Sequence, residues 1–125
     1  MSPARKARVR QRGGDCCEYC KLRQEDSPLA VLHVEHIIPR IHGGRDDLDN
    51  LALACIDCNL HKGPNLTGID PTTLRVTELF HPRRHRWADH FEWRGIYVVG
   101  KTAIGRTTVR VLKMNSEDQL ALRSS

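Results

Sequence analysis

The stretch HVEHIIPRIHGGRDDLDNLALACIDCNLHK, residues 33–62, decides the organisation of this chain. It holds an acid–histidine pair, a double-glycine turn, an Asp-Asn pair and a Cys-x-x-Cys unit within one short segment. A second Cys-x-x-Cys unit lies upstream, at residues 17–20. The two cysteine pairs enclose residues 21–54, so a ligand bound by both pairs would bring the two ends of that segment together.

Four cysteines have the spacing of metal ligands: Cys17, Cys20, Cys55 and Cys58. Four thiolates complete a tetrahedral zinc site and leave no open position, so we predict a structural Zn²⁺. Cys16 and Cys20 form a wider alternative pair; otherwise Cys16 is a spare thiol. The competing interpretation is a chance grouping of cysteines in a chain whose thiols stay reduced.

The residues between the pairs predict a strand. Residues 29–38, LAVLHVEHII, are rich in Val, Leu and Ile, and the strand should end before Pro39, which cannot donate to a ladder. Strand alternation puts His33 and Glu35 on one face and His36 on the other.

A short helix is predicted from Cys55 onward, because Gly63 and the proline after it are typical of a helix end. Cys55, Cys58, Asn59 and Lys62 then share one face at i, i+3, i+4 and i+7. Two metal ligands and two polar groups point toward the strand, a pattern that core packing does not explain.

Length and composition indicate one small basic domain. The chain has 125 residues, with 39% hydrophobic and only 5% aromatic residues, so its core should be modest and a structural metal would support it. The 20 basic and 15 acidic residues give a net charge of +5, which favours an anionic partner or simply solubility. With no secretory apolar region and no apolar run of about 20 residues, we expect a soluble cytoplasmic protein without a membrane span.

The two flanks carry weaker signals. Residues 1–15 form a basic N-terminal arm, either a solvated tail with a short helix or a phosphate-binding segment. In residues 67–125, the pattern predicts a β-type run near 74–79 and two strands, FEW and IYVVG, joined through Arg94-Gly95. It also predicts a helix from Thr102 to about Lys113. The last ten residues are expected to fray.

A basic loop, HPRRHR at residues 81–86, is expected to be solvated. It becomes a DNA contact only if it lies on the same side as His36. Trp87, Phe91 and Trp93 are expected to supply core.

The pair Glu35-His36 suits hydrolytic chemistry. Phosphodiester hydrolysis requires a water to lose its proton, and charge to be stabilised on the phosphate and the departing oxygen. His36 suits the first task and a divalent ion held by Glu35 the second, with Asn59 completing the ion's site. The alternative is an ordinary surface pair. His33 shares a face with Glu35, and of its two alternatives, a position near the metal or a packed or solvent-bonded strand histidine, the second is favoured.

The run EHIIP, HGG, DNL and CxxCNxxKG resembles the HNH endonucleases over roughly residues 17–63, and the four cysteines match the zinc-bearing subset of that family. The resemblance implies a ββα-metal (His-Me finger) fold around one catalytic metal. It makes His36 the general base, Glu35 and Asn59 metal ligands, and Asn50 the central motif residue that braces the loop before the helix. His61 is an alternative ligand to Asn59.

We therefore predict an α+β fold with three parts: the arm 1–15, a zinc-bound ββα-metal core at 16–66, and a C-terminal β-hairpin and helix extension at 67–125. The catalytic residues would be His36, Asn50 and Asn59. The resemblance also implies contact of Lys62 with phosphate. Arg40 and His42 are expected near the DNA backbone.

The predicted activity is hydrolysis of DNA phosphodiester bonds with Mg²⁺ or Mn²⁺, nicking or cutting double strands with little sequence preference. From the resemblance, the helix would approach the minor groove, so backbone contacts should dominate. The alternatives are a zinc-ribbon-like module that binds nucleic acid or protein without cutting, and a nuclease fold that has lost activity.

Overall fold

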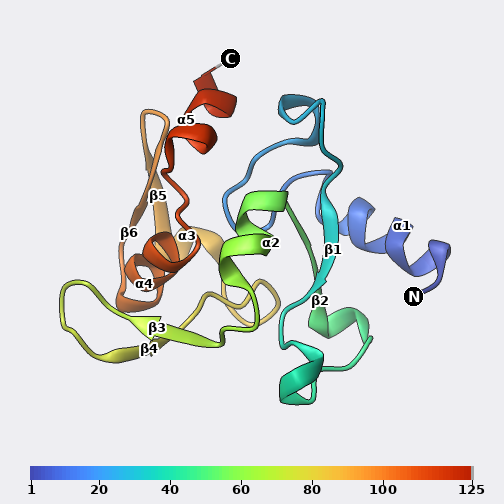
Figure 1. Cartoon of the computed structure of the whole chain (residues 1–125), viewed down its shortest axis with the longest axis horizontal. Coiled ribbons are helices and arrows are strands. Elements are labelled where there is room, and N and C mark those ends of the chain that lie inside the picture. The colour runs from blue at the N-terminus through green and yellow to red at the C-terminus, as the bar shows by residue number, and fades with distance from the viewer. Residues whose placement is uncertain (125) are drawn as a thin grey trace.

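In the computed structural model, which describes residues 1–124, the chain is a small mixed fold of short helices and three two-stranded antiparallel sheets (Figure 1). The helices are α1 (Pro3–Arg12), α2 (Ile56–Lys62), α3 (Trp87–His90), α4 (Ala103–Val111) and α5 (Glu117–Ser124). The strands pair as β1 (His33–His36) with β2 (Leu51–Ala54), β3 (Thr67–Ile69) with β4 (Val76–Glu78), and β5 (Phe91–Arg94) with β6 (Tyr97–Gly100).

The β1–β2 hairpin forms the middle of the molecule. Its register pairs Glu35 with Ala52, and all four residues of β2 are buried. The strand predicted over residues 29–38 is shorter than expected, because the backbone N–H of Leu32 donates to the Gln24 side chain (2.8 Å) instead of to a ladder partner. Of the two residues predicted to share a face, Glu35 is buried and His33 is exposed.

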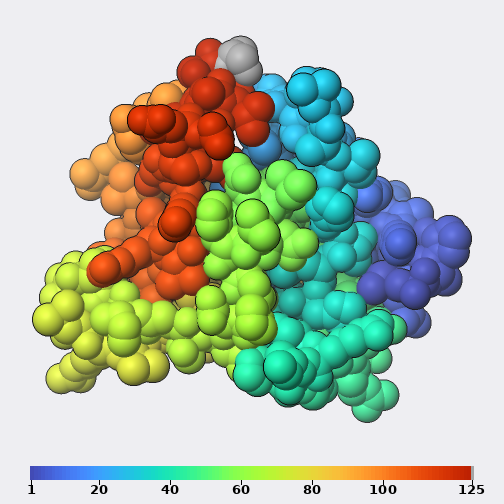
Figure 2. Space-filling view, in the orientation of Figure 1, coloured from blue at the N-terminus to red at the C-terminus, as the bar shows by residue number. Residues whose placement is uncertain are grey.

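Helix α2 follows β2 directly and agrees with the prediction. Cys55 caps it, since its Sγ accepts from the Cys58 backbone N–H at 3.4 Å, and Gly63 ends it with φ +50°. Cys58 and Lys62 lie on its buried face. In the space-filling view, α2 occupies the centre of the visible face, with the C-terminal extension on one side and the N-terminal half on the other (Figure 2).

The N-terminal segment contains the short helix that the first alternative allowed, and it is exposed at most positions but packs on the hairpin through Val9. Val9 is completely buried, and two arginines of α1 hold the hairpin: Arg10 donates to the Leu32 carbonyl at 2.7 Å and Arg12 to the Leu51 carbonyl at 2.6 Å. The basic residues therefore serve partly as structural donors to backbone carbonyls that the sheet leaves unpaired.

The C-terminal extension holds the predicted hairpin β5–β6 and the predicted helix α4, whose cap Thr102 accepts from the Gly105 N–H at 3.1 Å. Strand β3 was not predicted. The expectation that the last ten residues fray was wrong for residues 116–124, because α5 buries Gln119 completely, and Ser125 lies outside the described residues. Phe91 is in the core as predicted, whereas Trp93 is 45% exposed and does not supply core.

The extension and the N-terminal half share one core. Phe80 packs edge-on against Tyr19, with 6.4 Å between ring centroids, and the Trp87 indole N–H donates to the Tyr19 carbonyl at 2.8 Å. Arg83 of the basic loop pairs with Glu18 across the same boundary. These contacts hold the cysteine loop from the side opposite α2.

The loop between β1 and β2 is closed by one side chain. The Asn50 oxygen accepts from the Ile38 N–H at 2.8 Å, and its amide donates to the carbonyls of Ile38 (3.0 Å) and Arg45 (2.8 Å). Gly44 lies so close to the Ile38 carbonyl that any Cβ would clash with it. The loop is thus braced by Asn50, while a catalytic part for this residue stays a prediction.

Replacing Asn50 by alanine should lower the free energy of unfolding by about 2 kcal/mol, since three backbone groups lose their partner. Denaturant unfolding of the zinc-loaded protein measures this change. The matched control is Asn65→Ala, at an exposed position where no side-chain hydrogen bond is lost. Equal stability of the two variants would contradict the bracing role.

Candidate active site and metal sites

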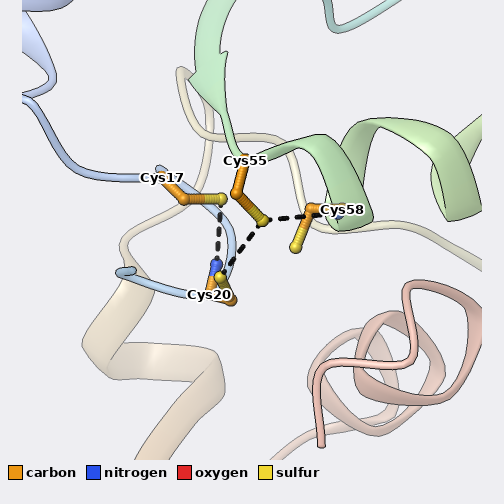
Figure 3. Close-up of side chains that lie close together, drawn as sticks. All are labelled: Cys17, Cys20, Cys55 and Cys58. Carbon is orange, nitrogen blue, oxygen red and sulfur yellow. Dashed lines mark hydrogen bonds between the residues drawn. The ribbon is translucent and has the colours of Figure 1, made fainter. Parts of the chain in front are cut away.

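Four sulfur atoms converge at the start of α2. The Sγ atoms of Cys17, Cys20, Cys55 and Cys58 all lie within 4.8 Å of one another, and all four residues are buried. Figure 3 shows Cys17 and Cys20 on one loop facing Cys55 and Cys58, and the Cys20 and Cys55 sulfurs are 3.7 Å apart. Tetrahedral zinc with bonds of about 2.3 Å separates two sulfurs by about 3.8 Å. The cluster therefore fits a structural Zn²⁺.

The electrostatics of the cluster also favour a cation. Burial raises the pKa of the Cys17 thiol, whereas hydrogen bonds from the neighbouring cysteine side chains, that of Cys17 first, lower the pKa of Cys55. Because burial disfavours the charged form of Cys17, all four cysteines could be thiolates only beside a compensating divalent cation. Cys16 lies apart, half-buried, with its thiol toward the Gly14 carbonyl at 3.4 Å. It is the spare thiol that the spacing predicted.

A glutamine from the C-terminal helix completes the surroundings of the sulfurs. The Gln119 side-chain amide donates to the Cys55 Sγ at 3.2 Å and Gln119 is completely buried. The backbone N–H of Cys20 points to the Cys17 Sγ at 3.5 Å in the same way. Donors of this kind stabilise thiolate ligands. Sequence analysis missed Gln119, because no local pattern in a polar tail indicates a contact with Cys55.

A second, open cavity of about 290 Å³ lies between β1 and α2. It is lined by Val34, Glu35, His36, Pro39, Arg40, Asn59 and Gly63. The structure thus brings together four of the predicted site residues, three from the β1 end and one from α2. His61 does not line it, so the geometry favours Asn59 as the polar group that α2 contributes.

Glu35 reaches this cavity from the interior. It is 6% exposed; the Tyr19 hydroxyl donates to its Oε1, and the Lys62 Nζ lies 3.7 Å from its Oε2. Burial raises the pKa of Glu35, and the opposing effects of Lys62 and Tyr19 are smaller. The carboxylate is therefore held by two protein donors and still has lone pairs for a metal ion.

Lys62 does not fit its predicted contact with phosphate. It is 2% exposed, and its ammonium donates to the Ile37 carbonyl at 2.9 Å as well as pairing with Glu35. A lysine is usually on the surface, which made the prediction reasonable. Here its charge compensates a buried carboxylate, because an unpaired charge in the interior would be costly.

His36 is fixed by an aspartate that sequence analysis did not single out. The His36 Nε2 lies 2.6 Å from the Asp46 Oδ1, and the Arg40 guanidinium is 3.0 Å from the same oxygen. The hydrogen bond with His36, followed by Arg40, lowers the pKa of Asp46, so the aspartate is an acceptor. A neutral His36 that donates to this carboxylate carries its proton on Nε2, and Nδ1 is then the acceptor nitrogen of the ring.

The remaining predicted contacts lie around this cavity. The Arg40 side chain is 68% exposed and lines its rim. His42 is exposed beside the end of α2, with Nε2 3.1 Å from the Pro64 carbonyl, outside the cavity lining. The basic loop 81–86 contributes nothing to this cavity; His81, Arg83 and Arg84 line a different hollow with the Gly43–Arg45 turn.

Comparison with known families finds one match, which covers part of the chain. The sequence model of the HNH endonuclease family matches residues 17–65, which confirms the resemblance for that segment and makes nuclease activity the expected one. No curated protein and no solved structure shows a match to the chain. Within residues 1–124, every helix is too short or too polar to cross a bilayer.

Stripping zinc with a strong chelator should unfold the domain, because the free energy of metal binding is part of the free energy of folding. Circular dichroism should show the cooperative thermal transition disappear as zinc content falls, and added Zn²⁺ should restore it. A metal-free protein that melts cooperatively at an unchanged temperature would show that the four cysteines do not hold a structural metal.

Replacing Gln119 by leucine should raise the zinc dissociation constant about 10-fold, the usual scale for an outer partner of a ligand. Competition with a chromophoric chelator measures this constant. Gln11→Leu on the exposed surface of α1 is the matched control and should bind zinc like the wild type. If Gln119→Leu does the same, the amide-to-sulfur bond does not stabilise the site.

Proposed function

We propose that β1, β2 and α2 form a ββα-metal centre that hydrolyses DNA phosphodiester bonds with a divalent ion. The observation that carries the proposal is the single cavity into which Glu35, His36 and Asn59 open, beside the four-cysteine cluster and within the HNH match. Composition alone would fit many small basic proteins. This grouping of a carboxylate, an imidazole and an amide is what a hydrolytic centre requires.

His36 is proposed as the general base. With its Nε2–H donated to Asp46, the Nδ1 lone pair takes the proton of the attacking water. The imidazolium formed in that step is stabilised by the Asp46 carboxylate 2.6 Å away. Asp46 keeps its own negative charge because its pKa is lowered by the same hydrogen bond, with Arg40 adding to the effect.

Glu35 and Asn59 are proposed as the residues that hold Mg²⁺ or Mn²⁺. Their carboxylate and amide oxygens are the hard donors that these ions prefer, and both residues line the same cavity. The bound ion would neutralise charge on the phosphate and on the leaving oxygen. Within the protein, the Glu35 carboxylate accepts a hydrogen bond from Tyr19 and forms an ion pair with Lys62.

DNA is the proposed substrate, bound through its backbone. Arg40 at the cavity rim and exposed His42 offer charge and hydrogen bonds without base recognition, and the chain carries a net charge of +5. Cleavage should therefore depend weakly on sequence. Lys62 supports this surface indirectly, by fixing the Ile37 carbonyl under the histidine, and does not itself contact phosphate.

A zinc-ribbon-like module that only binds nucleic acid or protein is the rival function. The four cysteines and the basic charge fit it equally well. It gives no reason for the hydrogen bond between His36 and Asp46 or for a buried glutamate that opens into a solvent cavity. Metal-dependent turnover separates the two functions.

A plasmid cleavage assay with Mg²⁺, Mn²⁺ or neither tests the proposal. The wild type should nick or cut only with the metal, and His36→Ala should lower the rate about 100- to 10,000-fold, the usual contribution of a general base. His33→Ala, three residues earlier on the same strand and exposed, is the matched control and should keep full activity.

Both variants are compared at equal zinc content and after a thermal melt. Cleavage that survives in His36→Ala would point to another base or to a contaminating nuclease. A wild-type protein that binds DNA but never cuts it with either metal would favour the binding module.

A further inference from the structure

Tyr19 joins the zinc site to the proposed catalytic carboxylate. It stands between two zinc-site cysteines, Cys17 and Cys20, is 1% exposed, and donates its hydroxyl hydrogen to the Glu35 Oε1. We propose that Tyr19 is a positioning residue that sets the carboxylate of Glu35 for the catalytic metal. This inference rests on the proposed function, because Glu35 matters as a metal ligand only there.

The position of the Tyr19 hydroxyl is determined by the cysteine loop. Cysteines on both sides of Tyr19 belong to the sulfur cluster, and the Lys21 N–H donates to the Cys17 carbonyl at 2.9 Å to close the turn. The Tyr19 carbonyl accepts from Trp87, and its ring packs edge-on against Phe80. Backbone and ring of this tyrosine are thus both held by contacts in the packed core.

Glu35 needs such a partner because it is almost fully buried. Each of its two oxygens has a different partner: Oε1 accepts from the neutral Tyr19 hydroxyl, and Oε2 lies 3.7 Å from the Lys62 ammonium. The ammonium is itself anchored on the Ile37 carbonyl. One hydrogen bond and one ion pair thus hold the carboxylate, and Glu35 lines the cavity that it shares with Asn59.

Loss of the hydroxyl leaves Lys62 as the sole remaining donor of this pair. The carboxylate then rotates toward the ammonium, because a buried charge moves to its closest compensating charge. Glu35 would be engaged in an ion pair instead of presenting an oxygen to the metal. The consequence is weaker binding of the catalytic ion, with the zinc site unchanged.

Binding of Mn²⁺ to the full-length, zinc-loaded protein tests this directly, without DNA and without turnover. The loss of the free Mn²⁺ signal in electron paramagnetic resonance gives the dissociation constant. Tyr19→Phe removes one oxygen atom and should raise this constant about 10-fold, the scale found for partners of metal ligands. Tyr97→Phe, at the exposed second tyrosine, is the matched control and should behave like the wild type.

Glu35→Gln separates the two levels of the proposal. If the wild type binds Mn²⁺, Glu35→Gln does not, and Tyr19→Phe binds as tightly as the wild type, the positioning role is overturned and the metal site stands. If Glu35→Gln binds Mn²⁺ like the wild type, the metal site itself is wrong and the inference fails with it. A Tyr19→Phe protein that loses zinc or its cooperative melt would assign the hydroxyl a purely structural role and overturn the proposal.

Discussion

The convergence of four sulfur atoms on one point is the constraint on which the rest of the structure depends. It ties the loop at residues 17–20 to the first turn of α2, and so closes a segment that holds β1, the braced loop and β2. Closing a long segment is entropically costly, and a metal ion bound to these four sulfurs would offset that cost in a chain with few aromatic residues. Helix α1 packs on one side of the hairpin and α2 on the other, with the C-terminal extension beyond α2 (Figure 1).

The same closure positions the residues of the proposed catalytic site, one turn beyond the sulfur cluster along α2. Cys55 is both a sulfur of the cluster and the cap of the helix, so the start and direction of α2 are set together, and Asn59 one turn later faces the cavity. On the opposite side, Tyr19 reaches from the cysteine loop to Glu35. We therefore propose that the two sites have separate roles. The sulfur cluster organises the fold, and the solvent-open cavity beside it would bind a second metal ion and a phosphate.

The features that depend on residues close together in the sequence were predicted correctly. The cysteine spacing indicated the sulfur cluster, and the Gly63-Pro64 end indicated α2. What was missed depends on contacts between distant residues. Asp46 was one acidic residue of several until the loop turned it toward His36, and Gln119 lay in a tail that is ordered by contacts with residues far away in the sequence, among them Cys55 and Ile96. The burial of the lysine at position 62 was unpredictable for the same reason, since its carbonyl and carboxylate partners come from β1.

We propose that one metal site stabilises the fold and that a separate metal site catalyses phosphodiester hydrolysis. Crystals of the zinc-loaded protein soaked in Mn²⁺, with anomalous diffraction recorded at energies that distinguish the two elements, test it most directly. We expect a zinc peak among the four cysteine sulfurs and a manganese peak in the cavity between Glu35 and Asn59. An absent zinc peak, or manganese bound only at surface carboxylates away from that cavity, would contradict it.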